Sequence, residues 1–399
     1  MQDLQKYAPQ IQKCAHCQFC QAACPVFLED LLETHTARAR LELIRACFLE
    51  NSLPPSSRFK EIIDRCLLCT NCVQTCPAAL PADEMVMAAR YQLYQGKRRN
   101  ALTRTALHRF MKQRGLGALL SRAGALAQGA GLLPPEFPAP SARPFLEQRK
   151  GVIPAEGKTR ARVAYFVGCG TNTFYPETAE DTVRVLTRNG IEVLLPEGLV
   201  CCGIPALAEG DLAFAQECAA KNMGILTGLQ VDAIITDCTS CGMSLKVKQP
   251  KLIPENDPLF MKAAVLAPKV WEATDYLNSL GLVEEPGRFP ARLTYHIPCH
   301  RGWSSTLKNA PRALCSRVSG AELIEMEYPE RCCGAGGLFF VNFRELAQSI
   351  RAKKVQDIQQ TGAQMVLTHC PSCKSYLAAA LPQLKVMHPL SLLARAYGF

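Results

Sequence analysis

Two runs of closely spaced cysteines stand near the N-terminus. The run CAHCQFCQAACP covers residues 14–25, and CLLCTNCVQTCP repeats its spacing at residues 66–77. Both follow the pattern C-x2-C-x2-C-x3-C-P, with which proteins hold [4Fe–4S] clusters. Three thiolates of such a run bind one cluster, and the fourth cysteine binds the other. The duplication therefore predicts two [4Fe–4S] clusters that exchange their fourth ligands.

This crossover divides the eight cysteines into two sets. Set A consists of Cys14, Cys17, Cys20 and Cys76. Set B consists of Cys66, Cys69, Cys72 and Cys24. Zinc is the alternative metal, but zinc sites usually pair two C-x2-C knuckles. Two full copies that both end in proline favour iron–sulfur clusters.

A second duplication follows in the rest of the chain. RVAYFVGC, IEVLLPEGLVCCG and VDAIITDCTSC read as strands that run into cysteines, with helices expected over 177–189 and 210–228. The same order returns in RLTYHIPC, AELIEMEYPERCCG and AQMVLTHCPSC, with a helix expected in FRELAQSIRAKKVQDIQQTG. This order predicts a repeated α/β unit with parallel strands. Ligand sites of such sheets lie at the carboxyl ends of the strands, so five thiols of each copy should meet there.

Each copy carries a lone cysteine, then C-C-G, then C-x2-C. The first box consists of Cys169, Cys201, Cys202, Cys238 and Cys241. The second box consists of Cys299, Cys332, Cys333, Cys370 and Cys373. Gly203 and Gly334 follow the paired cysteines, and we expect them to let the backbone approach a cofactor without a Cβ clash. Structural zinc and free vicinal thiols are the alternatives for both boxes.

The combination of both runs and both boxes resembles the iron–sulfur subunits of the glycolate oxidase and D-lactate dehydrogenase type. It is also similar to the lactate-utilisation iron–sulfur proteins, to the third subunit of anaerobic glycerol-3-phosphate dehydrogenase and to the catalytic part of heterodisulfide reductase. The helical stretch between the runs resembles the α-helical ferredoxin domain of succinate dehydrogenase. The resemblance implies one or two further [4Fe–4S] clusters in the boxes, of the noncubane kind in the heterodisulfide reductase relatives.

The expected fold is therefore a multidomain α+β protein. We predict an α-helical ferredoxin domain at 1–96, a basic helical segment and proline-rich linker at 97–160, and CCG domains at 161–288 and 289–399. Several other residues have competing interpretations. Cys47, Cys218 and Cys315 fit no pattern and are expected to be packing residues. His296, His300 and His369 flank the second box, either as outer-shell hydrogen-bond donors or as ordinary buried residues. Arg38 and Arg40 either cap or dock their helix or remain solvated.

The net charge of +10 is concentrated between Met85 and Pro135, where no acidic residue occurs. Its nine basic residues are Arg90, Lys97, Arg98, Arg99, Arg104, Arg109, Lys112, Arg114 and Arg122. The sequence from residue 97 to 133 reads as a basic amphipathic helix, which suits an anionic membrane surface, a partner subunit or simple solvation. Nucleic-acid binding is not expected, because few aromatic residues accompany the basic ones and no recognition motif appears.

The odd count of 21 cysteines in a long chain argues against a disulfide-bonded secreted protein. No export signal and no apolar stretch long enough to span a membrane is recognised, so a cytoplasmic location, with peripheral contact at the inner membrane as an option, is expected.

No dinucleotide fingerprint, HExxH or G-x-S-x-G motif is present. We therefore expect substrate oxidation to occur in a partner chain. By resemblance, that partner is an FAD-containing dehydrogenase of glycolate or D-lactate, and this chain relays its electrons to a quinone or another carrier. The rival hypothesis is a catalytic subunit that cleaves a disulfide at a noncubane cluster.

Overall fold

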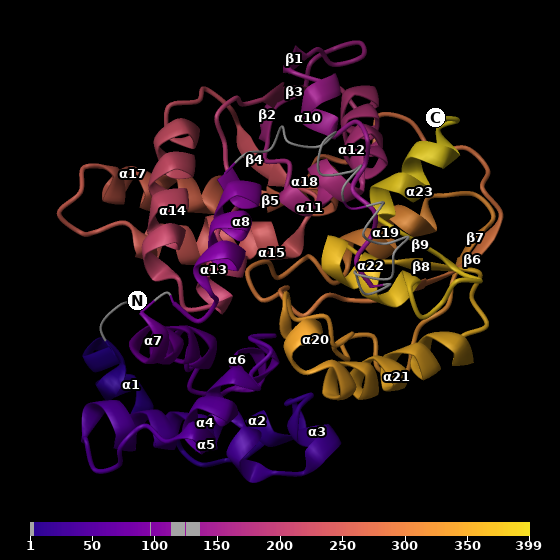
Figure 1. The fold of residues 1–399 in the computed structure, drawn as a ribbon. Helices are drawn as coiled ribbons and strands as arrows, with labels where there is room; N and C mark the ends of the chain where they lie inside the picture. Colours follow the sequence, from indigo (N-terminus) through magenta and orange to yellow (C-terminus); the bar gives the residue numbers. More distant parts are fainter. Residues whose placement is uncertain (1–3, 96, 113–123, 125–135) are drawn as a thin grey trace. The chain divides into compact units, whose positions relative to one another are not determined.

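The computed structural model describes residues 4–95, 97–112, 124 and 136–399 (Figure 1). They form two compact units, each assembled from separate stretches of the chain. The first unit contains Met1–Ala106, Gly203–Ala215 and Arg331–Lys354. The second unit contains Leu107–Cys202, Gln216–Glu330 and Val355–Phe399. The domain boundaries given above follow chain order and stay a prediction.

Helices build the part of the first unit that carries both cysteine runs. Its helices are α1 (Ala8–Ile11), α2 (Phe19–Ala22), α3 (Phe27–Asp30), α4 (Ala37–Ile44), α5 (Ser57–Asp64), α6 (Asn71–Thr75), α7 (Ala82–Tyr94), α13 (Ile204–Ala208) and α20 (Phe339–Asn342), with short 3-10 or π turns at Leu4–Tyr7, Glu33–His35 and Arg45–Leu49. Helices α8 (Ala101–Lys112), α14 (Leu212–Leu226) and α21 (Arg344–Gln360) contain residues of both units.

The helices predicted between the two cysteine runs are confirmed, and side-chain caps fix where they start. The Thr36 hydroxyl accepts from the Ala39 amide at 3.3 Å and begins α4, while the Ser56 hydroxyl accepts from the Phe59 amide at 3.1 Å and begins α5. Each such cap accepts a hydrogen bond from an amide that the first helical turn leaves unpaired, and it stabilises the helix by about 1 kcal/mol. These two helices lie between the cysteine runs in the chain and belong to the same unit as both runs.

Two parallel sheets form the second unit. One contains β1 (Gly151–Ile153), β2 (Ala161–Tyr165), β3 (Ile191–Leu195), β4 (Ala233–Thr236) and β5 (Val270–Glu272), in the order β1-β3-β2-β4-β5. The other contains β6 (Ala291–Tyr295), β7 (Ala321–Leu323), β8 (Met365–Leu367) and β9 (Lys385–Met387), in the order β7-β6-β8-β9. Only the pair β1–β3 is antiparallel among the described strands.

Helices follow most strands and complete the second unit. They are α10 (Phe145–Gln148), α11 (Cys169–Phe174), α12 (Pro176–Arg188), α15 (Thr239–Met243), α16 (Gln249–Leu252), α17 (Leu259–Leu266), α18 (Ala273–Leu280), α19 (Ala310–Ser316), α22 (Pro371–Ala378) and α23 (Pro389–Ala396). Without β1, the two sheets have the same strand order, so β2, β3, β4 and β5 correspond to β6, β7, β8 and β9. The predicted duplication is confirmed. Sequence analysis missed β5 and β9, which extend each sheet by a three-residue strand, and β1, which lies in the stretch read as a proline-rich linker.

One continuous apolar core joins the two sheets of the second unit. It contains Val163 and Tyr165 from the first sheet, Leu293 and Tyr295 from the second, and Leu390 from α23, all nearly inaccessible to water. Burial of side chains of this size contributes about 1.5–3 kcal/mol each. The two repeats therefore fold as one body, with the cysteine-bearing loops at the carboxyl ends of their strands.

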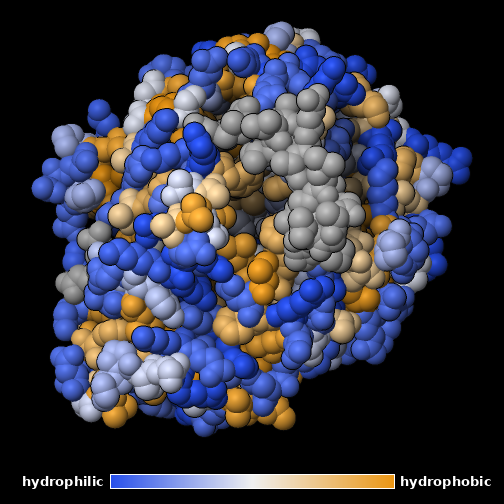
Figure 2. Space-filling model, in the orientation of Figure 1, coloured by the Kyte–Doolittle hydropathy of each residue, from blue (hydrophilic) through white to orange (hydrophobic). Residues whose placement is uncertain are grey.

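Two arginines of the basic window pair with acidic residues of the first unit. Arg98 contacts Asp64 at 3.2 Å and Glu209 at 3.3 Å, and Arg99 contacts Glu209 at 2.7 Å. Arg114 and Arg122 lie outside the described residues. The face seen in Figure 2 is mainly hydrophilic with scattered apolar residues, and none of the described helices is long and apolar enough to cross a bilayer.

Candidate metal centres

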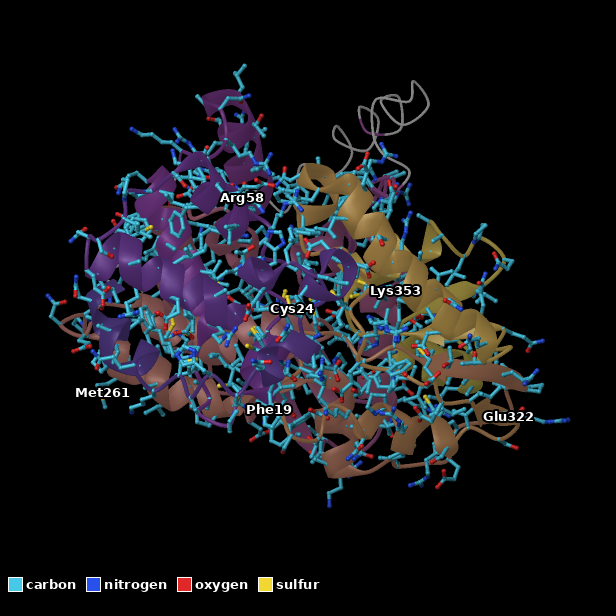
Figure 3. All side chains as sticks on the ribbon, turned by 90° about the horizontal axis from the view of Figure 1, so that it is seen from below. Phe19, Cys24, Arg58, Met261, Glu322 and Lys353 are labelled. Carbon is cyan, nitrogen blue, oxygen red and sulfur yellow. The ribbon has the colours of Figure 1, made fainter. Side chains whose placement is uncertain are left out.

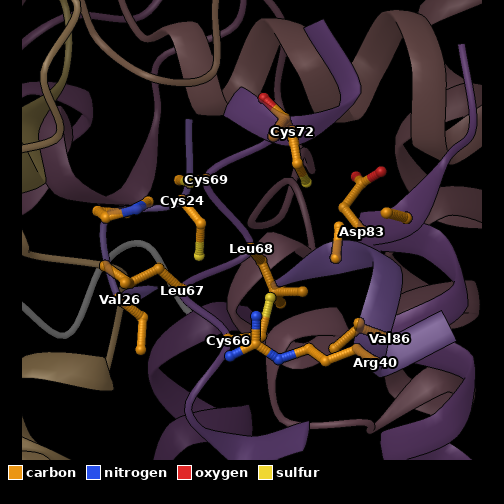
Figure 4. Close-up of a pocket in the computed structure, with 14 residues that line it drawn as sticks. Cys24, Val26, Arg40, Cys66, Leu67, Leu68, Cys69, Cys72, Asp83 and Val86 are labelled. Carbon is orange, nitrogen blue, oxygen red and sulfur yellow. The ribbon is translucent and has the colours of Figure 1, made fainter. Parts of the chain in front are cut away.

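A cavity in the first unit gathers set B. Cys24 from the first run lines it together with Cys66, Cys69 and Cys72 from the second, and its empty space, part of which is open to solvent, is about 440 Å³. Figure 4 shows the thiols of Cys24, Cys66 and Cys72 around this space. The first run thus contributes its fourth cysteine to the second, as the crossover pattern requires.

A second cavity gathers set A. Cys14, Cys17, Cys20 and Cys76 line it, and its empty space, part of which is open to solvent, is about 500 Å³. Cys72 lines this cavity as well as that of set B, so the two sites share a wall. Cys17 is exposed, and the neighbouring Phe19 is 58% exposed (Figure 3). Set A therefore lies at the surface of its unit.

The two runs also share an unusual backbone. The residue before the second cysteine has positive φ in both, 53° at His16 and 56° at Leu68. The residue after it does too, 66° at Gln18 and 60° at Thr70. Non-glycine residues rarely adopt this conformation. Left-handed turns of this type point consecutive N–H groups into a concavity that binds anions, including iron–sulfur clusters.

Buried arginines surround set B. Arg90 is 3% exposed, and its Nη2 donates to the carbonyl of Cys66 at 2.7 Å. Arg40 lines the cavity and is 2% exposed, which corrects the expectation that this residue might remain solvated. Burial, with smaller effects from Cys332 and Cys72, holds the pKa of Cys69 well above its usual range. Such thiols lose their protons only when a metal binds.

The first box converges within the second unit. The sulfurs of Cys169 and Cys201 lie 3.6 Å apart. The Cys241 thiol contacts those of Cys202 and Cys238, and these contacts together with burial raise its pKa. Two side chains fix the backbone of the paired cysteines. The Cys202 carbonyl accepts from Gln249 at 3.0 Å, and the Cys201 carbonyl accepts from Asn222 at 3.1 Å.

A glycine that sequence analysis missed makes room for this box. A Cβ on Gly168 would sit 3.0 Å from the Cys241 sulfur. The signal was present in the sequence, since Gly168 directly precedes Cys169 in VGCG. Gly203 and Gly334 have φ of 84° and 87°, and a Cβ on Gly334 would meet the Ala347 carbonyl at 2.6 Å. The backbone thus requires glycine at 334, and the role of both residues toward a cofactor stays a prediction.

The second box divides between the units. Cys299, Cys370 and Cys373 belong to the second unit, and Cys332 and Cys333 to the first, so the joint site stays a prediction. Within the first unit, Cys332 lies close enough to Cys69 for its charge to act on that thiol. Within the second, hydrogen bonds from Cys238 and Cys373 hold the pKa of Cys370 well below its usual range. The C-x2-C pairs of the two boxes are therefore in contact.

The histidines near the second box differ in their surroundings. His300 Nδ1 lies 2.9 Å from the Ser240 hydroxyl, which in turn lies 4.0 Å from the Cys370 sulfur. His296 has a ring nitrogen within 4.8 Å of the Cys373 sulfur. His369 instead bonds the Tyr295 hydroxyl at 2.9 Å and the Thr274 hydroxyl at 3.0 Å. His369 is thus a satisfied core residue, and His300 is placed to act on Cys370 through Ser240.

Glu272, His369 and His388 form a buried cluster with the dimensions of a cation site. The amide of Leu390 donates to His388 Nδ1 at 3.1 Å, so the ring proton of neutral His388 resides on Nε2. That nitrogen faces Glu272 at 3.3 Å. A metal that binds Nε2 would have to displace this proton. The proton could not move to Nδ1, because Nδ1 already accepts from the Leu390 amide. The cluster is therefore a buried polar group in which Glu272 accepts from the Thr274 hydroxyl and lies beside His388, at the start of α23.

Burial lowers the pKa of His388 from 6.5 to about 4, against the opposing charge of Asp237. Because the pKa is depressed in the folded state, His388 contributes full stability above about pH 6.5, and this contribution is lost as the pH falls toward about 4. At about pH 5 the loss should be about 2 kcal/mol. His388→Asn keeps an acceptor for the Leu390 amide but cannot take up the proton. Urea unfolding at pH 7 and pH 5 should show a smaller acid loss in this variant, and an equal loss would contradict the assignment.

The donor sets fit iron–sulfur clusters. Each cavity of the first unit is lined by its four predicted thiols, and Cys72 also borders the cavity of set A. Set B adds one carboxylate, Asp83, and a buried arginine nitrogen, Nη2 of Arg40, that has no hydrogen-bond partner among the described residues. A cluster sulfur is an acceptor for such a donor.

Comparison with known proteins agrees with this geometry. Residues 10–80 match the 4Fe-4S dicluster domain, and residues 163–246 and 293–378 match the cysteine-rich domain called CCG. The chain is thus an iron–sulfur protein in which a dicluster domain precedes a duplicated cysteine-rich domain.

Individual proteins with similar sequences narrow the class of iron–sulfur protein further. The chain is 33% identical to lactate utilization protein A of Bacillus pumilus over 57% of this chain and 96% of that protein. It is 25% identical to a probable glycolate oxidase iron-sulfur subunit of Bacillus subtilis over 98% of this chain and 94% of that protein. It is 32% identical to a subunit of the fumarate reductase (CoM/CoB) of Methanothermobacter marburgensis over 62% of this chain and 49% of that protein. The chain belongs to the family of iron–sulfur proteins that includes lactate utilization protein A and the glycolate oxidase iron–sulfur subunits.

A solved structure shares the fold. A hypothetical protein from Helicobacter pylori superposes with a TM-score of 0.54 at 8% identity, over 99% of this chain and 76% of that one.

Proposed function

We propose that this chain is the electron-transfer subunit of a flavin-dependent 2-hydroxyacid dehydrogenase, with glycolate or D-lactate as the substrate. It takes electrons from an FAD-containing partner and delivers them to a quinone or another carrier. The observation that carries this proposal is the shared wall at Cys72, which puts two four-thiol sites next to each other in one unit. Bound clusters would supply one-electron acceptance and donation.

The residues of this chain would hold the clusters as follows. Set A holds one [4Fe–4S] cluster and set B the other, and the first and second boxes hold one further cluster each. Within the first unit, Cys332 lies close enough to Cys69 for its charge to act on that thiol. Cys238 contacts Cys370 in the second unit and so connects the two boxes. Adjacent thiol sites within each unit suit electron transfer and serve no purpose in a protein that only needs structural zinc.

The proposal is tested by anaerobic purification of the native chain with whatever binds it. We expect a stoichiometric FAD protein that reduces a dye with glycolate or D-lactate, and the preferred acid identifies the substrate. Recovery of a brown chain without flavin would count against the proposal.

Helix α8 is the candidate for contact with a membrane or a partner subunit. Leu102 on this helix is 85% exposed, beside basic residues. Leu102→Glu should weaken flotation of the complex with anionic vesicles, while Leu53→Glu, an exposed leucine elsewhere in the first unit, should not. Equal flotation of both variants and the native chain would remove the membrane from the proposal.

Disulfide reduction is the second candidate function, favoured by the direct contact of Cys238 with Cys370, whose pKa is depressed. This candidate predicts cleavage of a low-molecular-weight disulfide with a reduced dye as the electron donor. Absence of that activity in a fully loaded protein would eliminate it.

A further inference from the structure

We propose that Arg40 sets the two ferredoxin-type sites to different reduction potentials, by donating a hydrogen bond from Nη2 into the set B cavity. The inference rests on the proposed function, since it needs clusters in both sets. It assigns to Arg40 an upward shift of the set B potential that set A does not receive.

The position of the Arg40 guanidinium is fixed from two sides. Its Nε donates to the Ile62 carbonyl at 2.9 Å, and its Nη1 donates to the His35 carbonyl. The third nitrogen, Nη2, is buried and has no hydrogen-bond partner within the described part of the chain. A buried donor without an acceptor destabilises the folded state, and more so when it is charged. Because this donor lines a cavity that contains four thiols, we expect its acceptor to be a group bound inside that cavity.

Figure 4 shows the side chain of Arg40 in this cavity. Its guanidinium is drawn next to Cys66, and both residues line the cavity. Its charge also acts on Cys24 and Cys72, the other two thiols seen around this space. Three of the four members of set B are therefore within its reach.

The charge of Arg40 is not neutralised by its anchors, because both anchors are neutral carbonyl groups. Arg90 adds a second buried guanidinium, which bonds the Cys66 carbonyl at 2.7 Å. Asp83 also lines the cavity and acts in the opposite direction, raising the pKa of Cys72 after burial and the neighbouring thiols. Substitution of Arg40 alone leaves Arg90 and Asp83 in place and isolates its own effect.

Set A has a different environment. The arginine on its cavity is Arg38, which is more exposed than Arg40 and pairs with Glu33. A paired, partly solvated charge has a weak effect at a distance. Arg38 and Arg40 are two residues apart on the same helix, yet they serve different cavities, and of the two only Arg40 brings an unpaired buried charge.

The direction of the effect follows from the charge of the cofactor. Reduction adds a negative charge to a cluster, and a cationic donor that bonds its sulfur stabilises that charge. Hydrogen bonds to the sulfurs, net charge and solvent exposure are the features with which proteins set cluster potentials. Removal of Arg40 should therefore make set B harder to reduce and leave set A nearly unchanged.

The test is a redox titration of the full chain followed by electron paramagnetic resonance. Cys20→Ser and Cys69→Ser first assign the signals to set A and set B. In Arg40→Gln, the ratio of reduced to oxidised set B at a fixed potential should fall about tenfold, which for a one-electron couple is about 59 mV. The matched control Arg38→Gln should shift either signal by less than a third of that. An unshifted set B signal in a loaded Arg40→Gln protein, or an equal shift of both signals, would overturn the proposal.

Arg40→Lys keeps the test decisive if Arg40→Gln fails to fold or to bind iron. Lysine keeps the charge but loses the fork that holds Nη2 in place. We expect full iron content, assayed with sulfide, and a smaller shift of set B in the same direction. An unchanged potential in this variant, together with a failure of Arg40→Gln to load, would mean that Arg40 only supports the fold. A native chain without two ferredoxin-type signals would instead contradict the proposed function itself.

Discussion

Replacing Cys24 with serine is expected to remove the spectroscopic signal of the second cysteine run, although Cys24 lies in the first. Cys24 lines the cavity of Cys66, Cys69 and Cys72, and it does not line the cavity of the other cysteines of its own run. A serine hydroxyl is a poor substitute for a thiolate at a soft metal site. Electron transfer driven by the substrate should fall by more than about 100-fold, since even outer-shell changes at metal sites cost about 10–100-fold.

The measurement compares three serine variants by electron paramagnetic resonance and iron content. Cys24→Ser and Cys69→Ser should lose the same signal, and Cys20→Ser should lose the other one. Cys47→Ser is the matched control, because Cys47 is a buried thiol of the same unit that lines neither cavity. Loss of the same signal in Cys24→Ser and Cys20→Ser would refute the crossover.

Glu272→Ala is expected to destabilise the second unit by about 3–5 kcal/mol, because it leaves several buried polar groups without the carboxylate that they contact. The Glu272 carboxylate accepts from the Thr274 amide at 2.7 Å and from the Asp275 amide at 3.3 Å, and so begins α18. It also faces His388 Nε2 at 3.3 Å. Loss of the helix cap alone costs about 1 kcal/mol. The unfolding midpoint should fall by about 10 °C or more.

Glu322→Ala is the control for this variant. Glu322 lies at the surface (Figure 3), with 65% of its side chain exposed, and contacts Arg292 at 3.5 Å. An exposed ion pair of this kind is worth less than about 1 kcal/mol. Calorimetry of both variants should show a large loss only for Glu272→Ala. Similar midpoints in the two proteins would mean that the buried polar group around Glu272 does not stabilise the second unit.

Local patterns in the sequence predicted most of the fold. The helices around both cysteine runs, the strand ends that carry cysteines and the repeat of the α/β unit all depend on spacing within short stretches. Strands β5 and β9 were missed because three residues give no periodic signal. The buried Cys47, Cys218 and Cys315 were predicted correctly as packing residues, since an isolated free thiol behaves as a small apolar side chain.

Features that depend on contacts between distant stretches were beyond reach. Arg40 lies in RARLELIR, where helical periodicity does not decide whether the arginine faces the core or the solvent. Its burial is explained by its hydrogen bonds to the carbonyls of His35 and Ile62. The polar core of the second unit was hidden for a related reason. Equivalent positions of the two repeats carry different residues, Asp237 before Cys238 and His369 before Cys370. Their partners, Tyr165 and Tyr295, are equivalent and come from strands far away in sequence.

The central claim is that this chain receives electrons from a hydroxyacid-oxidising flavoprotein. The most direct measurement is to add glycolate or D-lactate anaerobically to the purified complex and to the chain alone, and to record the iron–sulfur signals within one turnover. The account predicts reduced signals in the complex, none in the chain alone, and loss of the set B signal from the complex that contains Cys24→Ser. Reduction of the isolated chain by the acid, or a complex whose flavin is reduced while its iron–sulfur signals stay oxidised, would contradict it.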